Sequence, residues 1–320
     1  MSVGVRSVLV YGWESTFKTE ATTKDKIFGR GQELTTLTLN NNPELLYTLG
    51  SRFGESIVAR QLTGSWGIRA RLSNPWFLQG FFNSVSTTDN GDGSYTHTFS
   101  FSGNSNPKSL TIAAGVPAPD ENVARILLGG VITDISVSCS VNELVELSLS
   151  GIYADESLST TLPSAVSETE DAFTFAQGTL EIPSGTTIAE VQSISLTLRN
   201  NAIMVYGLGS RKPNSFTDRN IEITGDLSLR LRDSTFIKYL YGNSSATSPQ
   251  NSVDELASMK LTFTNGKTGA DKREIVFEIT GVMLNSLSMP IRPEDLIRIS
   301  IPFTGRQIQV KATNSTSTPK

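Results

Sequence analysis

Short stretches of alternating apolar and polar residues run along most of the chain. A period of two is typical of β-strands with one buried face. Residues 65–72, 133–141, 145–150, 227–232 and 297–301 alternate in this way. In each stretch the polar side carries Ser, Asp, Glu or Arg, as antiparallel sheets do when one face is wet. The pattern predicts a mainly β (α+β) protein.

The alternating pattern occurs twice because the sequence repeats itself. Residues 37–52 and 196–211 align without a gap and share ten of sixteen residues. The correspondence continues from residues 62–72 to 223–233 and from 141–149 to 293–301. Matched segments in the same order predict two tandem copies of one domain of about 150 residues.

Composition and the repeat together place the domain boundaries. Residues 154–172 are acidic, rich in Ser and Thr and contain Pro, which is typical of a linker. We expect a first domain at residues 1–153, with an N-terminal arm at 1–24, and a second domain at residues 173–311. Residues 312–320 are predicted to form a flexible tail. Each copy is predicted to be a β-sandwich or barrel with short packed helices.

Two short helices are predicted in each copy. Asn42, Pro43 and Gly50 are residue types that begin and end a helix. Asn201 and Gly209 stand at the same positions in the second copy.

A second pair of helices and a hairpin follow in the pattern. The helices are expected after Asn74-Pro75 and after Asp233, where apolar residues recur four positions apart. Residues 84–98 contain an Asn-Gly-Asp-Gly turn and predict a long hairpin.

Composition excludes several classes of function. The chain has 320 residues, is 38% apolar and 18% charged, and has a net charge of −4 with one His and one Cys. A single Cys cannot form an internal disulfide, which fits a reducing compartment. No apolar run approaches the ~18 residues of a membrane helix, and the N-terminus lacks a signal-peptide pattern. We therefore predict no membrane span, no enzyme activity, and no catalytic, cofactor-binding or metal-binding residues.

The remaining polar groups favour structural roles. No glycine-rich phosphate loop occurs, and His97 is expected on a strand surface. Clustered carboxylates lie beside Ser, Gly or Pro and are interpreted as solvent-exposed. These carboxylates are Asp89, Asp92, Glu168, Glu170, Asp171, Glu294 and Asp295.

Paired arginines recur on a polar strand face in both copies, as Arg69 and Arg71 and as Arg230 and Arg232. A nucleic-acid site would use such a face together with aromatic residues and a basic charge balance. Because the chain is net acidic, contact with a neighbouring subunit is the preferred interpretation.

Several short motifs resemble the tail tube proteins of tailed bacterial and archaeal viruses, and the long type of about 300 residues most of all. In chain order they are Gly12-Trp13-Glu14-Ser15-Thr16-Phe17-Lys18-Thr19, Phe28-Gly29-Arg30-Gly31-Gln32, Tyr47-x-Leu-Gly-Ser-Arg52, Asn74-Pro75 and Tyr95-x-His97. The resemblance implies a twisted sandwich or barrel with one helix. It also implies sheets that join side by side into a ring around a channel, with rings stacked through hairpins and termini.

The resemblance also implies partners and a location. The resemblance implies hexameric rings for tube proteins with one domain. A chain with two copies of the domain then implies a trimer with pseudo-sixfold symmetry. The rival is a hexamer with one domain outside the tube. The chain is expected in the virion tail, assembled in the host cytoplasm, beside sheath, baseplate and tail-terminator proteins. Double-stranded DNA is expected to pass through the channel without specific binding.

The resemblance allows a role to be predicted for the polar faces of the strands. A channel that passes DNA should be wet and not cationic, because each phosphate that Lys or Arg neutralises adds affinity. The candidate lumen residues are Ser136, Ser138, Ser140, Glu146, Ser148 and Ser150. Arg69, Arg71, Arg230 and Arg232 are expected at the subunit interface. The candidate inter-ring loop is Asp89, Asn90, Gly91, Asp92 and Gly93.

Two other classes of protein stay open. A baseplate or secretion-system tube component would share the same physical features and would differ in ring geometry. A carbohydrate-binding or adhesion module would instead be a monomer with an exposed aromatic platform.

Overall fold

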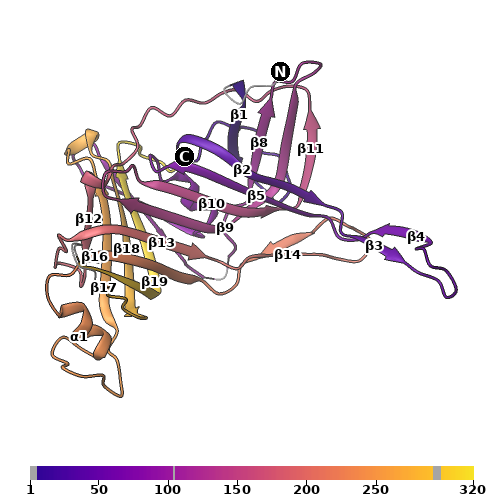
Figure 1. Cartoon of the computed structure of the whole chain (residues 1–320). Helices are drawn as coiled ribbons and strands as arrows, with labels where there is room; N and C mark the ends of the chain where they lie inside the picture. The colour runs from indigo at the N-terminus through magenta and orange to yellow at the C-terminus, as the bar shows by residue number, and fades with distance from the viewer. Residues whose placement is uncertain (1–5, 104, 291–296) are drawn as a thin grey trace.

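Strands dominate the computed structural model, which describes residues 6–103, 105–290 and 297–320 (Figure 1). Within these ranges, fifteen strands belong to one continuous antiparallel sheet. Its main path follows the order β12 (Gly178–Glu181), β17 (Leu256–Thr264), β18 (Glu274–Leu284), β19 (Arg298–Asn314), β16 (Glu222–Arg230), β13 (Val191–Arg199), β9 (Val123–Ser140), β10 (Glu146–Tyr153), β5 (Thr63–Arg71) and β2 (Arg30–Asn40). The predicted mainly β class is confirmed.

Five further strands branch from this path. β8 (Leu110–Val116) and β11 (Asp155–Ser159) pair with the first half of β9, and β1 (Val8–Trp13) pairs with β8. The hairpin of β6 (Ser84–Asp89) and β7 (Tyr95–Ser100) joins the sheet where β7 pairs with the end of β19. This confirms the hairpin predicted at residues 84–98. Because β7 and β19 come from opposite halves of the chain, the sheet curls back on itself (Figure 1).

The apolar face of the curled sheet forms one large core cluster, with residues from both halves of the chain. Trp66 and Leu149 belong to it from the first half, and Leu227, Phe277 and Phe303 from the second. The strands thus share one continuous sheet and one core and do not separate into two closed barrels. In the described part of the chain, no helix is long and apolar enough to cross a membrane.

Helices are few and short. α1 (Thr235–Tyr241) follows Asp233 as predicted and ends before Gly242. After Asn74-Pro75 the chain forms a single 3₁₀ helix, η2 (Trp76–Gly80), all of whose residues are buried. Two further 3₁₀ turns are η3 (Phe175–Gln177) and η4 (Gly269–Asp271).

The helices predicted to begin at Asn42 and at Asn201 are wrong. β3 (Pro43–Leu46) pairs with β4 (Ser56–Ala59), and β14 (Ile203–Val205) pairs with β15 (Ser215–Thr217). A helix N-cap has extended backbone, whereas φ is +45° at Asn42 and +50° at Asn201. Both asparagines therefore turn the chain into a hairpin. We call residues 43–59 the first arm and residues 203–217 the second arm.

The two halves contribute strands to the sheet in the same order. β2, β5, β10 and β9 are neighbours in the first half, and β13, β16, β19 and β18 are neighbours in the second. β9 of the first half pairs with β13 of the second. The two four-stranded groups therefore meet edge to edge within one chain.

Candidate functional site

One polar face of the sheet carries all the residues predicted to line a channel. Strand pairing places Ser148 beside Ser136, Glu146 beside Ser138, and Ser140 beside Ser193 of the second half. Their apolar neighbours on the same strands are buried, as the period of two requires. The structure therefore brings the six candidate lumen residues together.

The arginine pair of the first half lies on this same face and not on a separate one. Arg69 pairs with Ser148 across the strands, and Arg71 pairs with Glu146. Nη2 of Arg69 lies 2.7 Å from Oε1 of Glu146, and Arg71 also contacts this carboxylate. These hydrogen bonds, from Arg69 first, hold the pKa of Glu146 below its usual value. The single carboxylate of Glu146 therefore contacts two arginines.

A second ion pair lies where β9 meets β13. Nε of Arg199 is 2.5 Å from Oδ1 of Asp134. Partial burial raises the pKa of Asp134, but hydrogen bonds from Arg199, Thr133 and Ser150 outweigh it and hold the pKa below its usual value. The exposed Arg199 is therefore balanced by a carboxylate from the other half of the chain.

The arginine pair of the second half has different surroundings. Arg230 pairs with Arg298 across β16 and β19. Arg230 and Arg232 also line a groove of about 440 Å³ beside Phe236 and Tyr239 of α1. The repeat in sequence therefore does not give the two arginine pairs equivalent environments.

The turn predicted to contact another ring is exposed at the tip of the β6–β7 hairpin. The carboxylate of Asp89 accepts a hydrogen bond from the backbone N–H of Gly91 at 2.8 Å, and Asp92 accepts one from Ser94 at 3.0 Å. The side-chain hydrogen bond from Ser94 lowers the pKa of Asp92. These carboxylates therefore shape the turn locally.

His97 is buried, so its predicted position on a strand surface is wrong. Nδ1 lies 2.9 Å from the Thr87 hydroxyl and Nε2 lies 2.9 Å from the carbonyl oxygen of Thr316. The Trp76 ring meets it edge-on at 5.2 Å. β7 is enclosed because β6, β19 and η2 surround it, and burial lowers the pKa of His97. Its role is structural.

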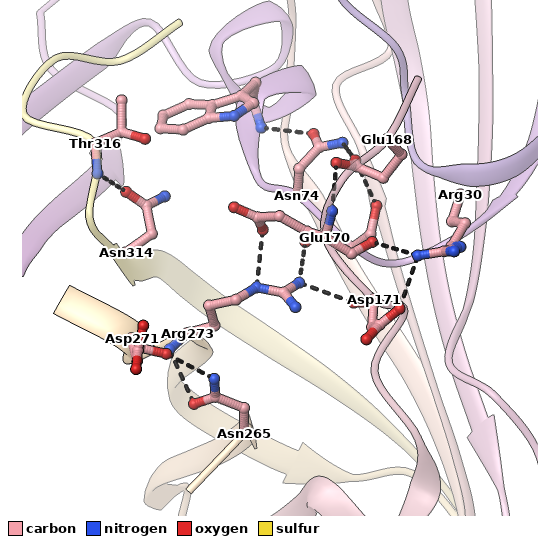
Figure 2. A network of polar contacts seen from close by, with 12 residues as sticks. Arg30, Asn74, Glu168, Glu170, Asp171, Asn265, Asp271, Arg273, Asn314 and Thr316 are labelled. Atoms are coloured by element: carbon pink, nitrogen blue, oxygen red, sulfur yellow. Dashed lines mark hydrogen bonds and ion pairs between the residues drawn. The ribbon is translucent and has the colours of Figure 1, made fainter. Parts of the chain in front are cut away.

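The carboxylates near residue 170 are not plainly solvated, which corrects a second expectation (Figure 2). Glu168 accepts hydrogen bonds from Ser73 at 2.8 Å and Asn74 at 2.6 Å. Glu170 lies 2.9 Å from Nε of Arg273, and partial burial raises its pKa. Glu294 and Asp295 lie outside the described residues.

The predicted linker is therefore attached to both halves of the sheet. Nη2 of Arg273, in the second half, donates hydrogen bonds to the carbonyl oxygens of Ser73 and Asp171 (Figure 2). The start of residues 154–172 forms β11, and β19 continues past residue 311 as far as Asn314. The domain boundaries themselves stay predictions.

Sequence reasoning missed the buried carboxylate of Glu14. It accepts hydrogen bonds from the backbone N–H groups of Lys18 and Gly129 and from the hydroxyls of Ser109 and Thr111, at 2.7–3.0 Å. The Gly-Trp-Glu-Ser-Thr motif contained this residue but gave no sign of its distant partners. In the ranges that the structure describes, no group of three or more His, Cys, Asp or Glu residues could hold a metal ion.

The first arm carries many exposed large apolar side chains, and the tip of the second arm carries Leu208, which is 107% exposed. Leu49 and Phe53 are 102% and 83% exposed, and Ile57 and Tyr47 are 71% and 68% exposed. On the second arm Phe216, which corresponds to Ile57, is only 7% exposed because it packs against Phe17. Large apolar side chains exposed together mark a surface that contacts another molecule.

Comparison with known proteins gives one family match. A family model described as "Phage tail tube protein" matches residues 4–275. No curated protein matches the chain.

Proposed function

The chain belongs to the phage tail tube protein family and is a structural component of the virion tail, and from that premise we propose that it closes into stacked rings around a channel for DNA. The family is structural, so the chain is not an enzyme. The finer description of the ring rests on three features of the sheet.

The two outer edges of the sheet support closure into a ring. β2, at one end of the path, pairs only with β5 in the described part of the chain. Towards the other end, β17 pairs with β18 only as far as Val282, so in the described residues the edge of the chain beyond Val282 is open. Open edges of this length invite uncontrolled pairing unless another strand occupies them. A ring occupies both edges with copies of the same chain.

The matched strand order supports a duplicated domain. Glu146 pairs with Arg71 in the first half, and Arg298 pairs with Arg230 in the second. The strand registers therefore match Arg71 with Arg230, two positions away from the sequence alignment, which matched Arg71 with Arg232. A repeated unit that joins its own copy within the chain through β9 and β13 can join further copies in the same way. Three chains then supply six units, which gives a trimer with pseudo-sixfold symmetry. A hexamer with half of each chain outside the tube is the alternative.

The polar face supports the proposed lining of the channel. It is rich in Ser and Thr, and around β9 its arginines Arg69, Arg71 and Arg199 each contact a carboxylate, whereas Arg230 lies opposite Arg298 across β16 and β19. DNA phosphates would replace those carboxylates only at an electrostatic cost, so this face would bind passing DNA weakly. We place Ser136, Ser138, Ser140, Glu146, Ser148 and Ser150 on the lumen and the turn at residues 89–93 between rings.

Negative-stain microscopy of the purified protein tests the proposal. We expect rings or tubes of constant bore at high protein concentration. A baseplate or secretion-system component would give rings of different geometry. A monomer that persists at every concentration would contradict ring formation.

A further inference from the structure

The second arm is held against the first half of the chain by a small set of hydrogen bonds. The Tyr206 hydroxyl donates to the carbonyl oxygen of Leu62 at 2.7 Å, and the N–H of Leu62 donates to the carbonyl oxygen of Arg211 at 2.9 Å. Nε of Arg211 donates to the carbonyl oxygen of Arg60 at 2.6 Å. The receiving surface, residues 41–42 and 60–62, is the base of the first arm.

The first arm has the same geometry as the second. φ is +89° at Gly50 and +88° at Gly209, the two glycines of the arm tips. Ser51 donates to the carbonyl oxygen of the residue two positions on, at 2.7 Å, and Ser210 does the same at 3.0 Å. Tyr47 and Arg52 of the first arm therefore stand where Tyr206 and Arg211 stand in the second.

The bases of the two arms also match. The N–H of Arg60 donates to the carbonyl oxygen of Asn41 at 3.1 Å, and the N–H of Arg219 donates to that of Asn200 at 3.0 Å. The base of the second arm, residues 200–201 and 219–221, therefore presents the same backbone groups as the base of the first arm.

The matching groups of the first arm and of the base of the second arm have no hydrogen-bond partner in the described residues. On the arm these are the side chains of Tyr47 and Arg52, and on the base they are backbone groups. Tyr47 is 68% exposed, and the arm projects from the body of the molecule (Figure 1). The carbonyl oxygen of Arg219 and the backbone groups of Ile221 accept or donate no hydrogen bond within the described chain. The chain thus carries one complete arm contact and the two separated halves of another.

We propose that the first arm of each chain docks on the base of the second arm of a neighbouring copy, repeating between chains the contact already made within the chain. This inference rests on the proposed ring and names the surfaces that close it. The Tyr47 hydroxyl donates to the carbonyl oxygen of Ile221, and the Ile221 N–H donates to the carbonyl oxygen of Arg52. Nε of Arg52 donates to the carbonyl oxygen of Arg219.

The receiving groups on the second base are backbone atoms, so the docking does not depend on identical side chains. This matters at Asn200, whose Oδ1 already accepts a hydrogen bond from the N–H of Ala202 at 3.0 Å and whose Nδ2 donates to the carbonyl oxygen of Ile132 at 2.8 Å. In the complete contact, the corresponding Asn41 instead accepts a hydrogen bond from Nη2 of Arg211 at 2.8 Å. The guanidinium of Arg52 therefore makes one contact fewer than that of Arg211.

Docking of the first arm also fixes how the two open sheet edges meet, because β2 leads directly into that arm. Within the chain, β13 leads into the second arm and pairs with β9, with Thr197 opposite Ser136. Thr38 is the counterpart of Thr197. Ser288 is the counterpart of Ser136, because it pairs with Ser300 as Ser136 pairs with Ser148.

The resulting register matches apolar residues with apolar residues. It places Thr38 opposite Ser288, Leu39 opposite Leu287, and Leu37 opposite Met289. Leu39 and Met289 are 40% and 38% exposed in the single chain. Ser288 exchanges both of its backbone hydrogen bonds with Ser300, at 2.9 and 3.0 Å, so those of Leu287 and Met289 face the open edge.

Disulfide cross-linking of assembled protein tests this register. The Thr197 and Ser136 hydroxyls lie 3.3 Å apart, which is within reach of a disulfide after replacement by Cys. Thr38→Cys with Ser288→Cys should link chains covalently up to a closed ring, and neither substitution alone should do so. Thr197→Cys with Ser136→Cys is the matched control and should link only within one chain.

Arg52→Ala tests the arm itself. We expect about tenfold more protein to be needed for half-maximal ring assembly, since hydrogen bonds to a charged donor are lost, with the thermal midpoint of the single chain unchanged. The matched control, Arg211→Ala, should lower that midpoint. Rings without interchain linkage, or normal assembly of Arg52→Ala, would overturn the docking and leave the ring proposal standing. If the unmodified protein forms no rings, the proposed function itself fails.

Discussion

Around β9, the arginines of the polar face each contact a carboxylate, whereas Arg230 on β16 lies opposite Arg298. Arg69 and Arg71 share Glu146, and Arg199 meets Asp134. The strand period in the sequence was enough to place these residues on a wet face. It could not show which acid each arginine contacts, because Glu146 lies 77 positions from Arg69 and Asp134 lies 65 positions from Arg199.

Glu146→Gln should increase non-specific binding of double-stranded DNA, because it frees two arginines. Each freed arginine that contacts a phosphate adds about 0.9 to the slope of log affinity against log salt. Fluorescence anisotropy with labelled DNA at several salt concentrations measures this slope. Acid should act in the same direction: because the two arginines lower the pKa of Glu146, it keeps its charge through the ordinary range of a glutamate and frees the arginines only in stronger acid.

The matched control for Glu146→Gln is Ser148→Ala, which changes the same face without changing its charge. We expect Ser148→Ala to leave the salt slope as in the unmodified protein. An unchanged slope in Glu146→Gln would show that the arginines of this face are not masked by that carboxylate.

At the scale of elements, the sequence identified strands better than helices. Strand alternation is a property of many residues, and it located β5, β9, β10, β16 and β19. The helices predicted at the two arms were wrong because Asn, Pro and Gly are compatible with both a helix and a hairpin. Contacts with residues distant in sequence decide between the two structures. His97 and Glu170 were misplaced for the same reason, since strands and side chains remote in sequence bury them.

Glu14 connects three elements and should be costly to remove. Its carboxylate joins the end of β1 to β8 and β9 through four hydrogen bonds. Glu14→Ala leaves those buried donors without an acceptor, and we expect a loss of about 3 kcal/mol in the free energy of unfolding. Denaturant unfolding measures it.

Glu20→Ala is the surface control for this substitution, because the Glu20 side chain, which pairs with Lys24, is exposed. It should change the free energy of unfolding by less than about 0.5 kcal/mol. A similarly small effect of Glu14→Ala would mean that water satisfies the buried donors.

At the scale of the whole molecule, the repeat in the sequence and the strand order in the sheet agree. The ten shared residues in 37–52 and 196–211 lie on β2, the first arm and its base, and on β13, the second arm and its base. These are the elements that would face a neighbouring unit. Sequence similarity concentrated there is expected if both halves make the same contact, one within the chain and one between chains.

The proposed trimer with pseudo-sixfold symmetry is tested by the number of chains in a ring. Cryo-electron microscopy of assembled tubes, or native mass spectrometry of single rings, measures it. A duplicated unit that closes the ring predicts three chains per ring, six similar units around the bore, and the face of Ser136 and Ser148 toward the channel. Six chains per ring, with half of each chain outside the tube, would contradict it.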